Sequence, residues 1–155
     1  MSTKVAAIAI VISLIISALL INAGSQGSIV VNGWPLFALC APIAFLLHWT
    51  FFIPSYILRT DHYFDLIGST SYVATAITAA MLSPSLDLRG IIICSMVVIW
   101  ATRLGLFLFT RIKQDGKDGR LDVIKTKFIL FLNLWTIGGL WVLVTIGAGL
   151  AAMTS

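Results

Sequence analysis

The chain has 155 residues, of which 59% are hydrophobic and 10% are charged, and its mean hydropathy is +1.05. A soluble domain usually carries about 25% charged residues, so this composition excludes an ordinary soluble domain and indicates an integral membrane protein. The formal net charge is +4, but the basic residues lie thinly between apolar runs and do not predict a nucleic-acid-binding surface. Cys40 and Cys94 lie within apolar segments and predict neither a disulfide framework nor a metal site.

A membrane-spanning helix needs about 20 largely apolar residues. In chain order, the segments that come close to this length are 5–23, 36–58, 66–82, 90–112 and 128–153. The first segment has no small-residue cleavage site after it, which favours an uncleaved signal anchor. We therefore expect one all-α domain over 1–155, a polytopic membrane helix bundle with about five transmembrane helices.

Two of these segments have compositions that predict particular roles in the bundle. Pro42 and Pro54 remove backbone donors from 36–58, so we expect this helix to bend. The segment 66–82 is rich in alanine, serine and threonine, which allow close approach of other helices. We expect it to be the central packing helix.

Most basic residues in the connections between the spans fall on one side of the membrane. Lys4, Arg59 and the basic loop 113–127 fall on one side, and Arg89 falls on the other. Because basic residues are enriched in cytoplasmic loops, this pattern predicts a cytoplasmic N-terminus and a C-terminus on the opposite side.

Arg103 lies inside the fourth predicted span, roughly 13 Å from its cytoplasmic end at the rise of an α-helix. Charged residues within membrane spans are costly and usually face the bundle interior, where they are paired or hydrated. We therefore expect Arg103 to face the bundle, with either a structural ion pair or a functional role.

His48 begins a polar stripe on the second span that ends at Arg59, close to three helical turns later. No second histidine or cysteine lies at a spacing that predicts a metal site. We interpret His48 as hydrogen-bonded to a neighbouring helix rather than catalytic.

The segment 60–65 places Asp61, His62, Tyr63 and Asp65 where the second span ends and the third begins. Such a cluster could polarise a carbonyl group of a lipid-like substrate or deliver a proton to it. For Asp65 alone we favour the role of N-cap of the third helix, where a carboxylate accepts hydrogen bonds from free backbone donors.

The basic loop 113–127, together with Arg111, is a candidate anion site. Arg111, Lys117 and Arg120 could hold the phosphates of a cofactor or the headgroup of an anionic lipid. The loop could equally be a topology determinant, and spacing alone does not separate these alternatives.

Four polar motifs resemble the N-terminal half of a bacterial integral-membrane family of unknown function related to steroid 5-alpha reductases. They are Thr60-Asp61-x-Tyr63-x-Asp65-Leu66-x-Gly68-Ser69-x-x-Tyr72, Trp100-x-x-Arg103-Leu104-Gly105-x-Phe107-Leu108-x-x-Arg111-Ile112, Gly116-Lys117-Asp118-x-Arg120-x-Asp122-x-x-Lys125 and Trp135-Thr136-x-x-Gly139-Leu140-Trp141-Val142. The resemblance implies NADPH-dependent reduction of a carbon–carbon double bond conjugated to a carbonyl, in the bacterial inner membrane.

The resemblance also implies roles for individual residues. Asp61 and Tyr72 would hold or protonate the substrate carbonyl. The cofactor phosphates would lie near four basic residues, Arg103, Arg111, Lys117 and Arg120.

The chain departs from the family pattern at Asp61, Gly138 and Leu121, where the family has Glu, Gln and Phe. The family's C-terminal Ser-Arg-His-Pro-Asn-Tyr-Phe-Gly-Glu motif, which would form much of the cofactor site, is absent from the sequence. We therefore expect this chain to supply the lipid-binding half of a reductase, incomplete alone. A separately encoded C-terminal half or a full-length homologue would complete it. The alternative is a non-catalytic membrane module that binds anionic lipid or a partner membrane protein.

Overall fold

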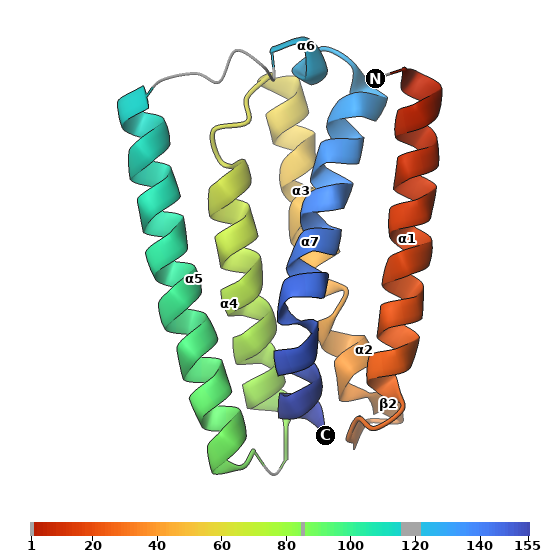
Figure 1. The fold of residues 1–155 in the computed structure, drawn as a ribbon, viewed down its shortest axis with the longest axis vertical. Helices are drawn as coiled ribbons and strands as arrows, with labels where there is room; N and C mark the ends of the chain where they lie inside the picture. Colours follow the sequence, from red (N-terminus) through yellow and green to blue (C-terminus); the bar gives the residue numbers. More distant parts are fainter. Residues whose placement is uncertain (1, 85, 116–121) are drawn as a thin grey trace.

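A computed structural model describes residues 2–84, 86–115 and 122–155, and its long helices run side by side in an all-α bundle (Figure 1). The long helices are α1 (Thr3–Ser25), α3 (Ile43–Ile57), α4 (Phe64–Leu82), α5 (Leu88–Asp115) and α7 (Phe128–Thr154). The shorter elements are β1 (Val30–Val31), β2 (Trp34–Pro35), α2 (Leu36–Cys40) and α6 (Asp122–Lys125).

The predicted polytopic membrane bundle is confirmed. Within the described residues, four segments are long and apolar enough to cross a membrane, namely Thr3–Ser25, Leu36–Ile57, Leu88–Arg111 and Phe128–Thr154. The remaining predicted span, 66–82, corresponds to α4, which is less apolar and lies in contact with α2, α3, α5 and α7. Its buried face carries Ser69, Ser71 and Thr75, so α4 packs closely against its neighbours, as its composition predicts. The helix that contacts the most other helices is α7, which meets α1, α2, α3, α4, α5 and α6.

The burial pattern of α1 is the reverse of that of a soluble helix. Its buried residues are the small Ala6, Ser13 and Ser17. Large aliphatic side chains point outward, including Ile8 at 58% and Leu19 at 66% exposure. A soluble monomer rarely exposes so much contiguous apolar surface, whereas small residues inside and large ones toward lipid suit a membrane bundle.

The second predicted span differs from the expectation of one bent helix. A break at 41–42 divides it into α2 and α3, because Pro42 cannot donate to the preceding turn. Pro54, in contrast, lies inside α3, which continues to Ile57.

Arg59 does not continue the helical stripe that begins at His48, so that prediction is wrong. The α3 helix ends at Ile57, and Arg59 adopts a left-handed backbone conformation with φ of 49°. The chain therefore turns away from the helix axis before it reaches Arg59.

The hairpin before α2 was not predicted. The β1 and β2 strands pair antiparallel, and both residues of the turn between them have positive φ, 51° at Asn32 and 84° at Gly33. Asn-Gly is the dipeptide that favours such a two-residue turn, so this hairpin had a sequence signal.

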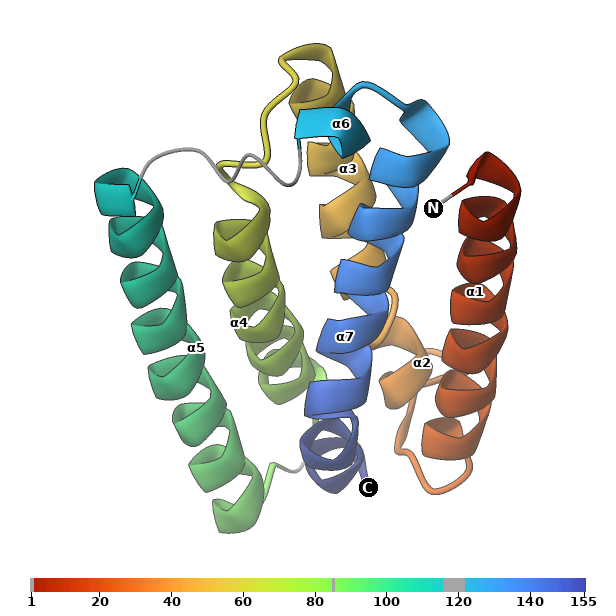
Figure 2. The same ribbon diagram turned by 45° about the horizontal axis from the view of Figure 1, so that its top comes forward.

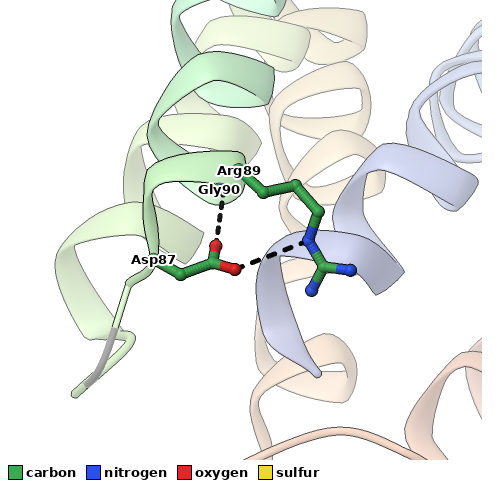
Figure 3. A network of polar contacts seen from close by, with 3 residues as sticks. All are labelled: Asp87, Arg89 and Gly90. Carbon is green, nitrogen blue, oxygen red and sulfur yellow. Dashed lines mark hydrogen bonds and ion pairs between the residues drawn. The ribbon is translucent and has the colours of Figure 1, made fainter.

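The α5 helix begins with a side-chain cap. The backbone N–H of Gly90 donates to Oδ1 of Asp87 at 2.7 Å, and Arg89 Nε lies 3.6 Å from the other carboxylate oxygen (Figure 3). A carboxylate at this position satisfies a backbone donor and favours the helix dipole. The cap explains why the helix begins at Leu88 rather than at the predicted residue 90.

The two ends of the bundle match the predicted sorting of charges. The N-terminus, α6 and the α3–α4 connection lie at one end, and the C-terminus, the hairpin and the start of α5 lie at the other (Figures 1 and 2). The α1 helix packs along α7, and the Ile29 N–H donates to the Thr154 carbonyl oxygen at 2.6 Å.

Candidate functional site: a cavity between α3, α4, α5 and α7

A cavity of about 280 Å³ lies where α4 meets α3, α5 and α7. Most of its wall is apolar, and its polar side chains are His48, Asp65, Ser69 and Tyr72. The remaining lining residues are Phe64, Gly68, Leu104, Leu108, Leu134, Ile137, Gly138, Trp141 and Val142. A mostly apolar pocket with a few convergent polar groups is typical of a small-molecule site.

His48 contributes a hydrogen-bond acceptor to this cavity. Its side chain is 1% exposed, and Nδ1 lies 2.7 Å from the carbonyl oxygen of Ala44 in the same helix. Because a carbonyl oxygen only accepts, Nδ1 carries the hydrogen, and in the neutral imidazole Nε2 keeps its lone pair. The Oγ of Ser71 on α4 lies 3.5 Å from the same Nδ1. His48 therefore contacts Ser71 on the neighbouring helix, as predicted, and makes its shorter hydrogen bond within its own helix.

Aromatic rings fix the orientation of His48. The imidazole ring meets Phe64 and Trp135 edge to face, with centroids 6.0 Å away in both cases. Phe64 and Trp135 also meet each other, at 5.2 Å and 86°. Edge-to-face contacts favour defined ring positions, so these contacts hold the imidazole in one orientation beside the cavity.

Two glycines shape the cavity in opposite ways. A Cβ atom at Gly138 would lie 2.8 Å from His48 Nε2 and 2.9 Å from Phe64 Cζ, so glycine at this position makes room for the imidazole. A Cβ atom at Gly68 would meet no atom within 4 Å, although Gly68 lines the cavity. Gly68 is therefore a position from which a larger side chain would fill the space.

Tyr72 and Asp61, the predicted catalytic pair, do not lie in the same site. Tyr72 is 4% exposed, lines the cavity and packs against Trp100 with ring centroids 5.0 Å apart. Asp61 is absent from the cavity wall, and its Oδ1 lies 2.5 Å from Nζ of Lys125 in α6. No sequence spacing indicated this pair, because Lys125 lies in the segment predicted to be a loop.

Asp65 lies at the polar end of the cavity, outside the apolar spans. The prediction that it is the N-cap is wrong, because α4 begins at Phe64 and Tyr63 occupies the cap position. Asp65 nevertheless lies in the first turn, where a carboxylate suits the helix dipole. Partial burial raises its pKa, the charge of Arg111 opposes this rise, and the charge of Asp61 adds to it. The charges of Arg111 and Asp61 thus both act on Asp65 at one end of the bundle.

Arg103 is exposed on the outer face of α5, so the prediction that it faces the bundle is wrong. The reason is helical geometry. Ala101 and Gly105 are the buried residues on either side of it, and a Cβ atom at Gly105 would lie 2.8 Å from Ser69 Cβ of α4. A residue two positions from each of these is turned by about 200°, which places Arg103 on the opposite face.

The other predicted cofactor-binding residues lie toward the polar end. Arg111 is exposed near the end of α5. Lys117 and Arg120 lie outside the described residues.

Comparison with known proteins identifies one family. Residues 51–155, more than half of the chain, match the family model described as "Protein of unknown function (DUF1295)". The match includes α4, α5 and α7, whereas His48 lies before its first residue. No curated protein and no solved structure matches the chain.

Proposed function

The chain belongs to the DUF1295 family of proteins of unknown function, and we propose that it binds the polar end of a lipid in the cavity between α3, α4, α5 and α7. The observation that supports this function is the pairing of an apolar wall with two hydrogen-bonding side chains, the His48 imidazole and the Tyr72 phenol, which also hydrogen-bonds Thr145. A lipid has the matching combination of an apolar chain and a small polar group.

We further propose that this lipid is an enone and that the chain supplies the lipid-binding half of a membrane reductase. The motif resemblance supports this step. The Tyr72 hydroxyl would donate a hydrogen bond to the substrate carbonyl oxygen and stabilise the negative charge that develops there during reduction. Asp61 would act indirectly, because its carboxylate pairs with Lys125 at the bundle end rather than with a ligand in the cavity.

NADPH is the proposed cofactor, and when bound it supplies the hydride. Arg111 fits a role in binding its phosphates, because it is an exposed cation at the polar end of α5. Lys117 and Arg120 are proposed to act with it. Arg103 does not fit, because it lies about 12 Å deeper along the helix, on a face turned away from the cavity.

The proposed setting is the bacterial inner membrane, with the N-terminus in the cytoplasm. The start of α1, which holds Lys4, and the α3–α4 connection, which holds Arg59, lie at one end of the bundle, and the start of α5, which holds Arg89, lies at the other (Figure 1). This sorting supports the orientation. A C-terminal half encoded separately, or a full-length homologue, would complete the cofactor site.

Lipid binding can be tested with a matched pair of glycine substitutions. Gly68→Leu fills the cavity, whereas Gly147→Leu adds the same side chain to α7 at a position that is equally open and lies outside the cavity wall. The probe is tritiated (E)-3-dodecen-2-one, a linear enone, offered to the full chain in nanodiscs. We expect saturable binding by the native chain and by Gly147→Leu, and a loss of at least about tenfold in affinity for Gly68→Leu.

Equal binding by both leucine variants would overturn the cavity as the site. Dodecane, which has the same length and no carbonyl, measures non-specific partitioning. If dodecane competes as well as the unlabelled enone, the polar groups of the cavity do not select the ligand.

The alternative function is a non-catalytic module that binds anionic headgroups, and the exposed Arg111 at the membrane edge favours it. NADPH binding by the native chain that Arg111→Ala plus Arg120→Ala abolishes would support the reductase half. Salt-sensitive binding to phosphatidylglycerol vesicles, with no NADPH binding, would support the alternative.

A further inference from the structure

Arg103 is an exposed cation in the middle of an apolar, membrane-spanning face. Its neighbours on the outer face of α5 are large and exposed, among them Ile99 at 68%, Leu106 at 62% and Phe107 at 59%. Trp100, Leu104 and Phe107 line a surface hollow with it. Among the residues that the structure describes, Arg103 has no ion pair and no hydrogen bond from its side chain.

The position of Arg103 along α5 prevents an easy route to water. The apolar stretch runs from Leu88 to Arg111. Arg103 lies about 12 Å from Arg111 and about 22 Å from Leu88 at the rise of an α-helix. Side chains on a helix lean toward its N-terminus, so that of Arg103 leans toward the more distant surface. An unpaired charge at this depth is costly in lipid.

We propose that the outer face of α5 docks a transmembrane helix of another membrane protein, and that this helix carries an aspartate or glutamate at the depth of Arg103. The charge of Arg103 determines this chemistry, because a carboxylate forms the strongest hydrogen-bonded pair with a guanidinium. The exposed side chains of Met96, Ile99, Arg103, Leu106 and Thr110 follow spacings of three and four residues, which is the seam that one helix presents to another.

Among the described residues, no carboxylate of a second copy lies at the depth of Arg103. These acidic residues lie in the connections or in the first or last turn of a helix, and they are Asp61, Asp65, Asp87, Asp115 and Asp122. Asp65, in the first turn of α4, lines the cavity of its own bundle. Two copies side by side would therefore place apolar residues opposite Arg103.

Docking can be tested with the full chain and designed peptides in phosphatidylcholine vesicles. The probes are fluorescent leucine-rich transmembrane helices that differ only in a single central residue, glutamate or leucine. Energy transfer should show the native chain binding the glutamate peptide about 3- to 30-fold more tightly than the leucine peptide. Arg103→Leu should abolish this preference. Arg89→Leu, which removes a cation from the same helix at the membrane edge, should retain it.

Equal binding of the two peptides, or a preference that survives Arg103→Leu, would overturn the proposal. Energy transfer between differently labelled copies of the native chain, lost in Arg103→Leu, would identify a second copy as the occupant and also overturn it. Arg103→Leu removes an exposed charge from an apolar face, so its melting temperature should not fall, and a loss of binding would not reflect misfolding. This proposal does not depend on lipid binding in the cavity. The Gly68→Leu experiment measures enone binding by this chain without a peptide, so either proposal can fail while the other holds.

Discussion

Asp61 and Lys125 form an ion pair at one end of the bundle, with side chains 18% and 6% exposed. Removing one partner of a largely buried pair takes away the opposite charge that stabilises the other. We predict that Asp61→Asn lowers the free energy of unfolding by about 3 kcal/mol, the lower end of the range for buried pairs. Titration of the purified protein from mild detergent into dodecyl sulfate, followed by circular dichroism, measures this change.

A double substitution distinguishes a structural role of Asp61 from a catalytic one. Asp61→Asn with Lys125→Met should recover most of the lost stability, because the double variant removes both charges of the pair from the protein interior. Arg89→Ala, which breaks an exposed pair at 3.6 Å, should change stability by less than about 0.5 kcal/mol. Unchanged stability in Asp61→Asn would contradict the structural role.

For single residues, the sequence indicated candidate functional residues better than it indicated which residues they contact. The motif resemblance implied a substrate-contacting role for Tyr72, and Tyr72 lines the cavity, but that role stays a prediction. Asp61 pairs with a residue 64 positions later in the chain, and no local pattern specifies such a contact. His48 and Arg59 have helical spacing, but the helix ends between them.

The contact between α4 and α5 depends on one glycine. A Cβ atom at Gly105 would lie 2.8 Å from Ser69 Cβ, closer than ordinary packing allows. We predict that Gly105→Leu forces the two helices apart and destabilises the protein by about 1–3 kcal/mol. Thermal unfolding in detergent, monitored by tryptophan fluorescence, measures the effect.

Gly147, which lies on α7, is the control position for Gly105. A Cβ atom there would meet nothing within 4 Å. Gly147→Ala should therefore stabilise the protein by about 0.5–1 kcal/mol, because alanine loses less backbone entropy than glycine in a helix. Equal destabilisation by both substitutions would show that the spacing of α4 and α5 does not depend on Gly105.

The helices themselves were largely predictable, because apolar runs of this length have few alternatives in a membrane. The break between α2 and α3 was anticipated only as a bend at Pro42. The buried face of α5 could not be predicted from the hydrophobicity of its residues, since apolar side chains surround most of the helix. Small residues marked that face instead, and Ala101 and Gly105 turn toward α4.

For the whole molecule, the sorting of charges predicts which end of the bundle is cytoplasmic. In a variant with Cys40→Ala and Cys94→Ala, single cysteines can be placed at Ser2, Lys127, Gln26 and Arg89, all of which are exposed. In intact cells, a membrane-impermeant maleimide should label the cysteines at Gln26 and Arg89. Those at Ser2 and Lys127 should react only after the membrane is opened. The reverse pattern would contradict the orientation that the basic residues predict.

The packing of α1 along α7 affects how the protein is made. About 100 residues separate the end of α1 from the start of α7, which a ribosome takes roughly 5–20 s to add. During this interval the serine-bearing face of α1 lacks the helix that covers it in the finished bundle. The insertion machinery or surrounding lipid must therefore hold α1 until the last helix arrives, and slower translation lengthens the period in which another membrane protein can capture it.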